Sequence, residues 1–120
     1  MADLASTARI ANNADRDAVI ALWQACDLTR PWNDPIADFD RALAAATSDI
    51  LILHEGDVLI ASVMVGYDGH RGWVYYLAVH PEHRRKGLGR DMMQAAEAWL
   101  QERDAPKIQL MVRSDNADVI

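Results

Sequence analysis

Apolar residues recur at helical spacing near the start of the chain. They lie three or four positions apart, as on one face of a helix, at Val19, Leu22, Trp23 and Cys26. Asn13 or Asp15 could cap this helix. We therefore expect a first helix whose apolar stripe faces a core, with Cys26 as a small buried side chain. A short first strand from Ala8 to Ala11 would precede it.

A second helix is predicted to begin at Asp34 and Pro35, with the aspartate at the cap and the proline in the first turn. Its buried side would be formed by Ile36, Phe39 and Leu43. The connection before this helix carries Trp32 between two prolines. This tryptophan could fill the gap between the helices or wall a substrate pocket, because aromatic side chains serve packing and binding equally well.

The middle of the chain has the β-branched, aromatic and apolar composition of buried strands. These strands are expected at Ile50–His54, Val58–Tyr67 and Trp73–Val79. Asp68 and Gly69 indicate a hairpin turn. A helix from Leu88 to Arg103 would then cross over to a last strand, Lys107–Val112, parallel to the strand before it. We expect one α/β (α+β) domain, residues 1–120, with a mixed, mostly antiparallel sheet flanked by helices.

A basic loop with two glycines connects the third expected strand to this helix. Free N–H groups and a positive dipole end make a helix N-terminus a binding site for anions, and Gly87 and Gly89 would let an anion approach closely. The neighbouring cations favour a diphosphate over a lone carboxylate. Gly89-Arg90-Asp91 does not supply the Gly-Lys-Ser/Thr of a nucleoside-triphosphatase loop, and Met92 stands where a Rossmann fingerprint needs a small residue.

The same loop resembles the acetyl-CoA loop of the GNAT superfamily of N-acetyltransferases, whose signature is Arg/Gln-x-x-Gly-x-Gly/Ala after a Val-x-Pro-like turn. The matching stretch is Arg84-Arg85-Lys86-Gly87-Leu88-Gly89 after Leu77-Ala78-Val79-His80-Pro81. The resemblance extends from about residue 8 to residue 120. Residues 26–35 and 66–72 are most similar to small bacterial YpeA-type members.

The resemblance implies that acetyl-CoA donates an acetyl group to a primary amine of a small molecule or peptide, which attacks the thioester directly. The residues implied to hold the cofactor are Arg84, Arg85, Lys86, Gly87, Leu88, Gly89, Arg90 and Asn116. The pantetheine arm would add like a strand beside Leu77, Ala78 and Val79. A backbone N–H at or near Val79 would then stabilise the developing oxyanion.

The general base is harder to assign, because the expected strand Trp73–Val79 contains no acidic residue. The candidates near the cleft are Asp34, Asp68, His70, Tyr75 and Tyr76. We assign catalysis to Tyr76 and Asp68, although Asp68 before a glycine also suits a plain turn. Substrate contacts are expected from Trp32, Asp34 and Tyr75. Tyr75 and Tyr76 would point to opposite faces of their strand, one into the core and the other into the pocket.

Relatives usually carry a tyrosine after this point that protonates the thiolate, followed by two further strands. Here no tyrosine follows Tyr76, and the sequence ends at Ile120. The C-terminal part of the usual GNAT domain is thus expected to be absent: either this chain is a truncated form, or another residue, another subunit or water supplies the proton. The strand Lys107–Val112 would then be an uncovered sheet edge, which predicts a homodimer through that edge.

Composition narrows the remaining classes of protein. The formal charge is −6, and the loop is a basic island, whereas a nucleic-acid binder usually carries a wide basic face. No run of about 20 apolar residues exists, so we expect no membrane span and a cytoplasmic protein without a nucleic-acid partner. We also expect no metal site, because His80 and His83 lack a third ligand. The alternatives to an enzyme are a non-catalytic acyl-CoA-binding module and an interaction subunit.

Overall fold

The computed structural model describes residues 8–32, 34–67, 72–84, 86–103 and 108–110. Its strands are β1 (Arg9–Ile10), β2 (Ser48–Glu55), β3 (Val58–Tyr67), β4 (Gly72–Val79) and β5 (Ile108–Leu110). Its α-helices are α1 (Arg16–Ala25), α2 (Pro35–Ala44) and α3 (Leu88–Glu102), and its short 3-10 helices are Asn13–Asp15 and Pro81–His83.

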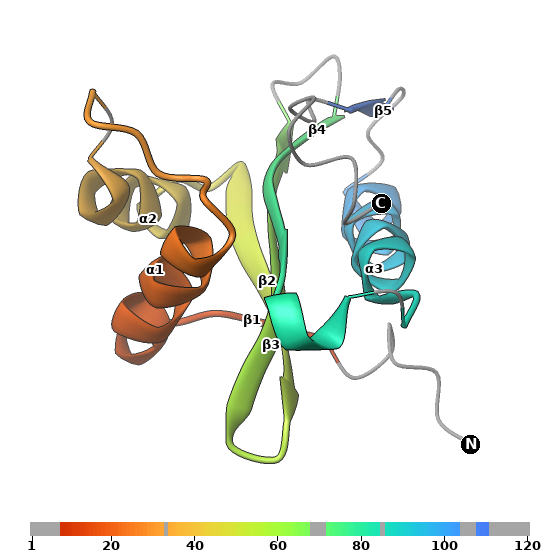
Figure 1. The fold of residues 1–120 in the computed structure, drawn as a ribbon. Coiled ribbons are helices and arrows are strands. Elements are labelled where there is room, and N and C mark those ends of the chain that lie inside the picture. The colour runs from red at the N-terminus through yellow and green to blue at the C-terminus, as the bar shows by residue number, and fades with distance from the viewer. Residues whose placement is uncertain (1–7, 33, 68–71, 85, 104–107, 111–120) are drawn as a thin grey trace.

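The strands form one five-stranded sheet in the order β1-β2-β3-β4-β5. Neighbouring strands are antiparallel except for β4 and β5, which are parallel. Helices α1 and α2 cover one face of the sheet, and α3 covers the other (Figure 1). The predicted mixed, mostly antiparallel sheet flanked by helices is therefore confirmed, as is the parallel last strand.

Each face of the sheet has its own apolar core. Under α1 and α2 the largest buried side chains are Trp23 and Phe39, which are fully inaccessible to solvent. The predicted apolar stripe of the first helix is confirmed, because all four of its residues are buried. Under α3, the core includes Met92 and Trp99 packed on β3 and β4.

Two local predictions about the helices hold only in part. Asp15 occupies the N-cap position of α1, as expected for one of the two candidates, but its side chain makes no capping hydrogen bond there. The side-chain cap lies at the start of the 3-10 helix Asn13–Asp15, where Oδ1 of Asn12 accepts from the N–H of Ala14 at 2.9 Å. Asp15 instead turns back to accept from the N–H of Asn12. In α2, Ile36 is 49 % exposed because the buried face is set by Phe39 and Ala42.

A β-bulge in β4 changes which residues share a face. Met64 of β3 lies opposite Tyr75 and Ser62 lies opposite Ala78, so the single residue between them on β3 faces two residues on β4. Tyr76, at this point, has a left-handed φ of 53°. The extra residue shifts the alternation, and both tyrosines line the same pocket on the α2 side. The prediction that Tyr75 and Tyr76 point to opposite faces is therefore wrong.

Candidate functional site

The loop between β4 and α3 ends in a left-handed glycine. Gly87 occupies the N-cap position of α3 with φ 79°, a conformation that side chains other than glycine's adopt at a cost. No side chain at this position caps the first turn, and a Cβ there would meet no atom within 4 Å. The space beside Gly87, directly before the first turn, is therefore open, as an anion site at a helix N-terminus requires.

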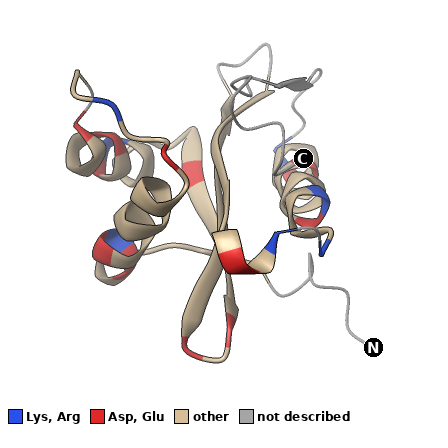
Figure 2. Ribbon diagram, viewed as in Figure 1, with Lys and Arg blue, Asp and Glu red and all other residues tan. Residues whose placement is uncertain are grey.

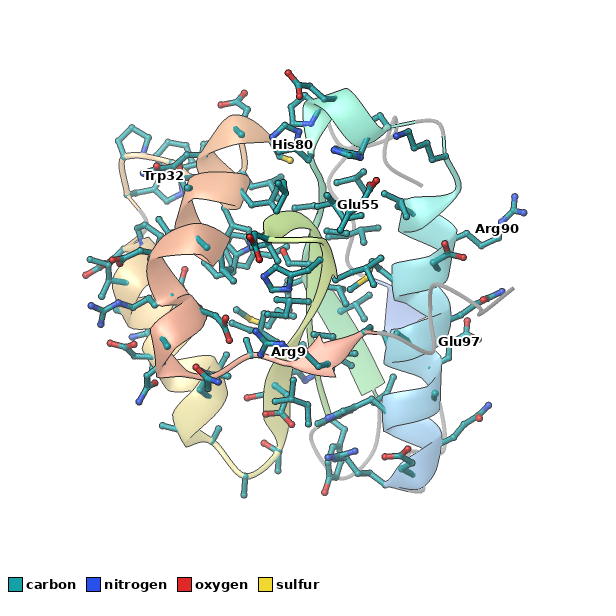
Figure 3. The ribbon with its side chains drawn as sticks, turned by 90° about the horizontal axis from the view of Figure 1, so that it is seen from below. Arg9, Trp32, Glu55, His80, Arg90 and Glu97 are labelled. Atoms are coloured by element: carbon teal, nitrogen blue, oxygen red, sulfur yellow. The ribbon has the colours of Figure 1, made fainter. Side chains whose placement is uncertain are left out.

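The predicted cations of the loop have different surroundings. Arg84 is tethered to the end of β4, where its Nε donates to the carbonyl of Val79 at 3.3 Å. Lys86 is exposed, with its Nζ 3.4 Å from Nδ1 of His83. Arg90 is exposed and extends outward from α3 (Figure 3). Arg85 and Asn116 lie outside the described residues, so their predicted roles stay predictions.

Charges of both signs lie around this loop. Figure 2 shows acidic residues on α1, on α2 and at the tip of the β2–β3 hairpin, with some Lys and Arg among them, and both signs of charge at the loop and on α3. The chain as a whole has a formal charge of −6. Lys86 and Arg90 place two exposed cations beside the first turn of α3, where they can attract an anionic ligand.

Beyond the bulge, every second residue of β4 directs its backbone N–H and C=O groups away from β3. The N–H of His80 donates to the carbonyl of Ile60 at 2.8 Å, and Ala61 lies opposite Val79. Because paired residues in antiparallel strands alternate, the N–H and C=O of Val79 point away from β3. Within the described part of the chain, β5 pairs with β4 only from Gly72 to Val74.

The carbonyl of Val79 is already engaged. It accepts from Sγ of Cys26 at 3.2 Å as well as from Arg84. A carbonyl oxygen has two lone pairs, so these two donors satisfy it. The polar group of Val79 that a ligand could use is therefore its N–H, and the buried Cys26 has a structural partner, in keeping with its predicted place in the core.

A pocket of about 400 Å³ lies on the α2 side of β4. Its lining residues are Asp38, Arg41, Ala42, Ala45, Thr47, Ser48, Met64, Trp73, Tyr75 and Tyr76. Helix α2 supplies the charged groups and β4 supplies three aromatic rings, of which Tyr75 is 40 % exposed. Trp73 and Tyr75 meet with their ring centroids 5.0 Å apart. This combination of apolar walls and few polar groups is typical of a small-molecule site.

Tyr76 connects the floor of this pocket to a carboxylate. Its hydroxyl donates to Oδ2 of Asp38 at 2.7 Å, and Oδ1 of Asp38 accepts from Arg41 at 2.7 Å. The ring of Tyr76 stacks on Trp23, with centroids 4.2 Å apart and planes 14° from parallel. The aromatic stack and the hydrogen bond together fix the phenol in one orientation.

Several predicted site residues do not line this pocket. Trp32 is 78 % exposed on the connection between α1 and α2 (Figure 3). Asp34 caps α2, since its Oδ1 accepts from the N–H groups of Ile36 and Ala37. Asp68 lies outside the described residues.

Two residues that the sequence interpretation missed are Asp38 and Arg41. Three positions apart on a helix, they have the spacing of an ordinary surface ion pair, and nothing in the sequence marks Asp38 as the partner of Tyr76. Among the residues that the structure describes, no group of three or more His, Cys, Asp or Glu side chains could hold a metal ion. None of the described helices is long and apolar enough to cross a membrane.

Residues 16–120 match the profile of the Acetyltransferase (GNAT) family. The chain is 47 % identical over 112 residues to an acetyltransferase of Pectobacterium atrosepticum and 45 % identical to one of Sodalis glossinidius, covering 93 % of this chain and 79 % of each relative.

Solved structures share the fold. A predicted acetyltransferase of Clostridium acetobutylicum with acetyl-CoA matches with a TM-score of 0.77 and 18 % identity, over 93 % of this chain and 84 % of that one. The enzyme AAC(6')-Iy, in complex with the bisubstrate analogue CoA-S-monomethyl-acetylneamine, matches with a TM-score of 0.77 and 16 % identity, over 91 % of this chain and 80 % of its own. On the sequence profile and the identity to curated relatives, this chain belongs to the GNAT acetyltransferase family.

Proposed function

We propose that this protein transfers an acetyl group from acetyl-CoA to a primary amine of a small molecule or peptide. The observation that carries the proposal is the position of Tyr76. The bulge turns its ring into the α2-side pocket, directly before the stretch of β4 whose backbone points away from β3. An amine bound in the pocket would thus lie beside the strand along which a thioester could be held.

The first turn of α3 is proposed to bind the diphosphate of acetyl-CoA. Gly87 leaves room beside the start of the first turn, and Lys86 adds a charge that can turn toward the ligand. We propose that the other predicted cofactor-binding residues contribute to the same site: Arg84, Arg85, Leu88, Gly89, Arg90 and Asn116. Two structural neighbours, one with acetyl-CoA and one in complex with a CoA bisubstrate analogue, support this choice of ligand.

The exposed backbone of β4 is proposed to align the pantetheine arm. Leu77 and Val79 alternate in orientation with Ala78, so both present backbone groups to the side away from β3. When bound, acetyl-CoA supplies an activated acetyl thioester. The N–H of Val79, whose carbonyl is engaged elsewhere, donates to the carbonyl oxygen of that thioester and stabilises its negative charge. A donor in such a position contributes about 2.7–4 kcal/mol to lowering the barrier.

Tyr76 and Asp38 are proposed to remove the proton from the amine. The phenol donates to Asp38, and because a hydroxyl oxygen can accept as well as donate, the incoming amine could bond to the same oxygen. As the amine nitrogen forms its bond to the acetyl carbon, its proton passes to Tyr76 while the phenol proton passes to Asp38. The carbon–sulfur bond breaks, and the thiolate of CoA takes up a proton from the solvent, to which Asp38 returns the proton that it received.

A transfer assay tests this function. The purified chain is mixed with acetyl-CoA and a panel of primary amines, and both released thiol and acetylated amine are quantified. Tyr76→Phe keeps the ring on Trp23 but removes the hydroxyl, and we expect kcat to fall by about 10²–10⁴ with little change in the KM for acetyl-CoA. Tyr67→Phe is the matched control, because Tyr67 packs on Trp99 under α3.

The outcomes separate the functions considered. Acetylated amine from the wild type and a selective loss in Tyr76→Phe would support the proposal. Binding of acetyl-CoA without transfer to any amine would favour the acyl-CoA-binding module instead. Equal kcat values for Tyr76→Phe and wild type would contradict the role given to Tyr76.

Three expectations from the sequence remain predictions. These are a single domain over residues 1–120, a cytoplasmic location, and a homodimer through Lys107–Val112, of which the structure describes only the strand Ile108–Leu110. Sedimentation at tens of micromolar, with a charge placed in that strand by Gln109→Lys, tests the dimer. A wild-type chain that sediments as a monomer would refute it.

A further inference from the structure

His83 lies between the β2–β3 hairpin and the basic loop. Its Nδ1 is 3.4 Å from Oε2 of Glu55 at the end of β2 and also 3.4 Å from Nζ of Lys86. The side chain is only 18 % exposed, and its ring meets that of His80 edge-on with centroids 5.5 Å apart. Figure 3 shows Glu55 beneath the turn that carries His80. One imidazole nitrogen therefore lies near a charged group of the hairpin and a charged group of the loop.

One nitrogen cannot bond favourably to both partners at once. If Nδ1 carries a hydrogen, it donates to the carboxylate of Glu55 but repels the ammonium group of Lys86. If Nδ1 is bare, it accepts from Lys86 and its lone pair faces the carboxylate of Glu55. The position of one proton therefore decides whether Lys86 is held at His83 or released from it.

A bound phosphate changes this balance. Lys86 directly precedes Gly87, so its ammonium group is within reach of an anion at the first turn of α3. Once Lys86 turns to that anion, Nδ1 is left facing Glu55, which favours a hydrogen on Nδ1 and a positive ring. The other charged neighbours in the described chain are Glu82 and Arg84 on either side of His83, and Arg84 is held by the carbonyl of Val79.

We propose that His83 is a positioning residue that couples proton uptake to cofactor binding, by releasing Lys86 to the diphosphate when its Nδ1 bonds to Glu55. The proposal rests on the acetyl-CoA site proposed above. Binding and protonation favour each other reciprocally, because each stabilises the same arrangement of Lys86. The affinity for the cofactor therefore falls as the pH rises, by at most about tenfold for each pH unit when one proton is taken up on binding.

Calorimetry with dephospho-CoA tests this coupling. This probe keeps the diphosphate and lacks the 3′-phosphate, whose own proton dissociates near pH 6 and would add a second signal, as in phosphomonoesters generally. Titrations in two buffers of different ionisation enthalpy give the number of protons taken up on binding. We expect uptake of a fraction of a proton by the wild type.

Three variants isolate the contribution of His83. His83→Asn places an amide near the position of Nδ1 but does not titrate, so it should bind the probe with no proton uptake and with an affinity that is flat in pH. Glu55→Gln, at an exposed position, should reduce the uptake and serves if His83→Asn fails to fold. Asp57→Asn, in the same turn and equally exposed, removes the same charge and should leave the uptake unchanged.

The results separate this proposal from the proposed function. Binding with equal proton uptake by the wild type, His83→Asn and Glu55→Gln would overturn the role of His83 and leave the cofactor site intact. If the folded wild type does not bind the probe at all, the cofactor site is wrong and the proposal falls with it.

Discussion

Gly87 offers a way to separate backbone strain from ligand binding with a single methyl group. Gly87→Ala would place a Cβ where no atom lies within 4 Å, so it creates no clash. Its cost to stability is then the left-handed backbone at φ 79°, about 1–2 kcal/mol for a residue other than glycine. The same Cβ would stand beside the N–H groups proposed to receive the diphosphate.

Gly87→Ala should also weaken the binding of acetyl-CoA, an effect that the lower stability of the fold does not explain. Holding the diphosphate away from one N–H removes a hydrogen bond to a charged group, worth about 1.5–3 kcal/mol. Acetyl-CoA should therefore bind roughly ten to more than a hundred times more weakly. Urea unfolding measures the first effect and calorimetric titration measures the second.

Gly56 is the matched control. It has a φ of 61° in the β2–β3 turn, and a Cβ there would also meet no atom within 4 Å. Gly56→Ala should therefore cost about the same stability and leave the affinity for acetyl-CoA unchanged. If both alanine variants lose similar stability and both bind acetyl-CoA as tightly as the wild type, the reasoning that places the diphosphate at Gly87 is refuted.

Three further predictions concern packing and charge. Phe39→Ala, at a fully buried position, should lower the free energy of unfolding by about 3–5 kcal/mol, as measured in urea. Gly66→Ala should raise the acceptor KM but not the KM for acetyl-CoA, because a Cβ at Gly66 would collide with the ring of Trp73 and move this wall of the pocket. The hydrogen bonds from Arg9 lower the pKa of Asp15, so this pair stabilises the fold fully above the usual aspartate range, and the stabilisation is lost as the pH falls through the lowered pKa of Asp15. Arg9→Met should therefore be less stable than the wild type at pH 7, and the difference should shrink as the pH falls below the usual aspartate range; a difference that does not shrink in acid would contradict this assignment.

The architecture could be predicted because local signals agree with it. Helix α2 begins where Asp34 and Pro35 predict, and β3 spans the residues that the apolar run predicts. The loop before α3 could be predicted as an anion site because two glycines and several cations directly precede a helix, whereas the left-handed φ of Gly87 is known only from the structure. In these places the chemistry of one short segment decides its conformation.

The pocket was harder to predict because it depends on contacts between distant segments. The bulge at Tyr76 arises from the register between two strands, and strict alternation in the sequence gives no sign of it. Asp38 becomes a partner of Tyr76 across 38 positions only once α2 packs on the sheet. Ile36 was expected to be buried, yet the small Ala42 lies closer to the core because the face of α2 is set by tertiary packing.

The most direct test of the central claim is a calorimetric titration of the chain with acetyl-CoA, repeated on Gly89→Glu. Gly89 lies in the first turn of α3, where a carboxylate would repel the diphosphate and occupy its space. Gln94→Glu, at an exposed position on the same helix, adds the same charge away from the loop. The account predicts saturable binding by the wild type and Gln94→Glu, and loss of binding in a Gly89→Glu protein that circular dichroism shows to be folded. Undiminished binding by folded Gly89→Glu would contradict it.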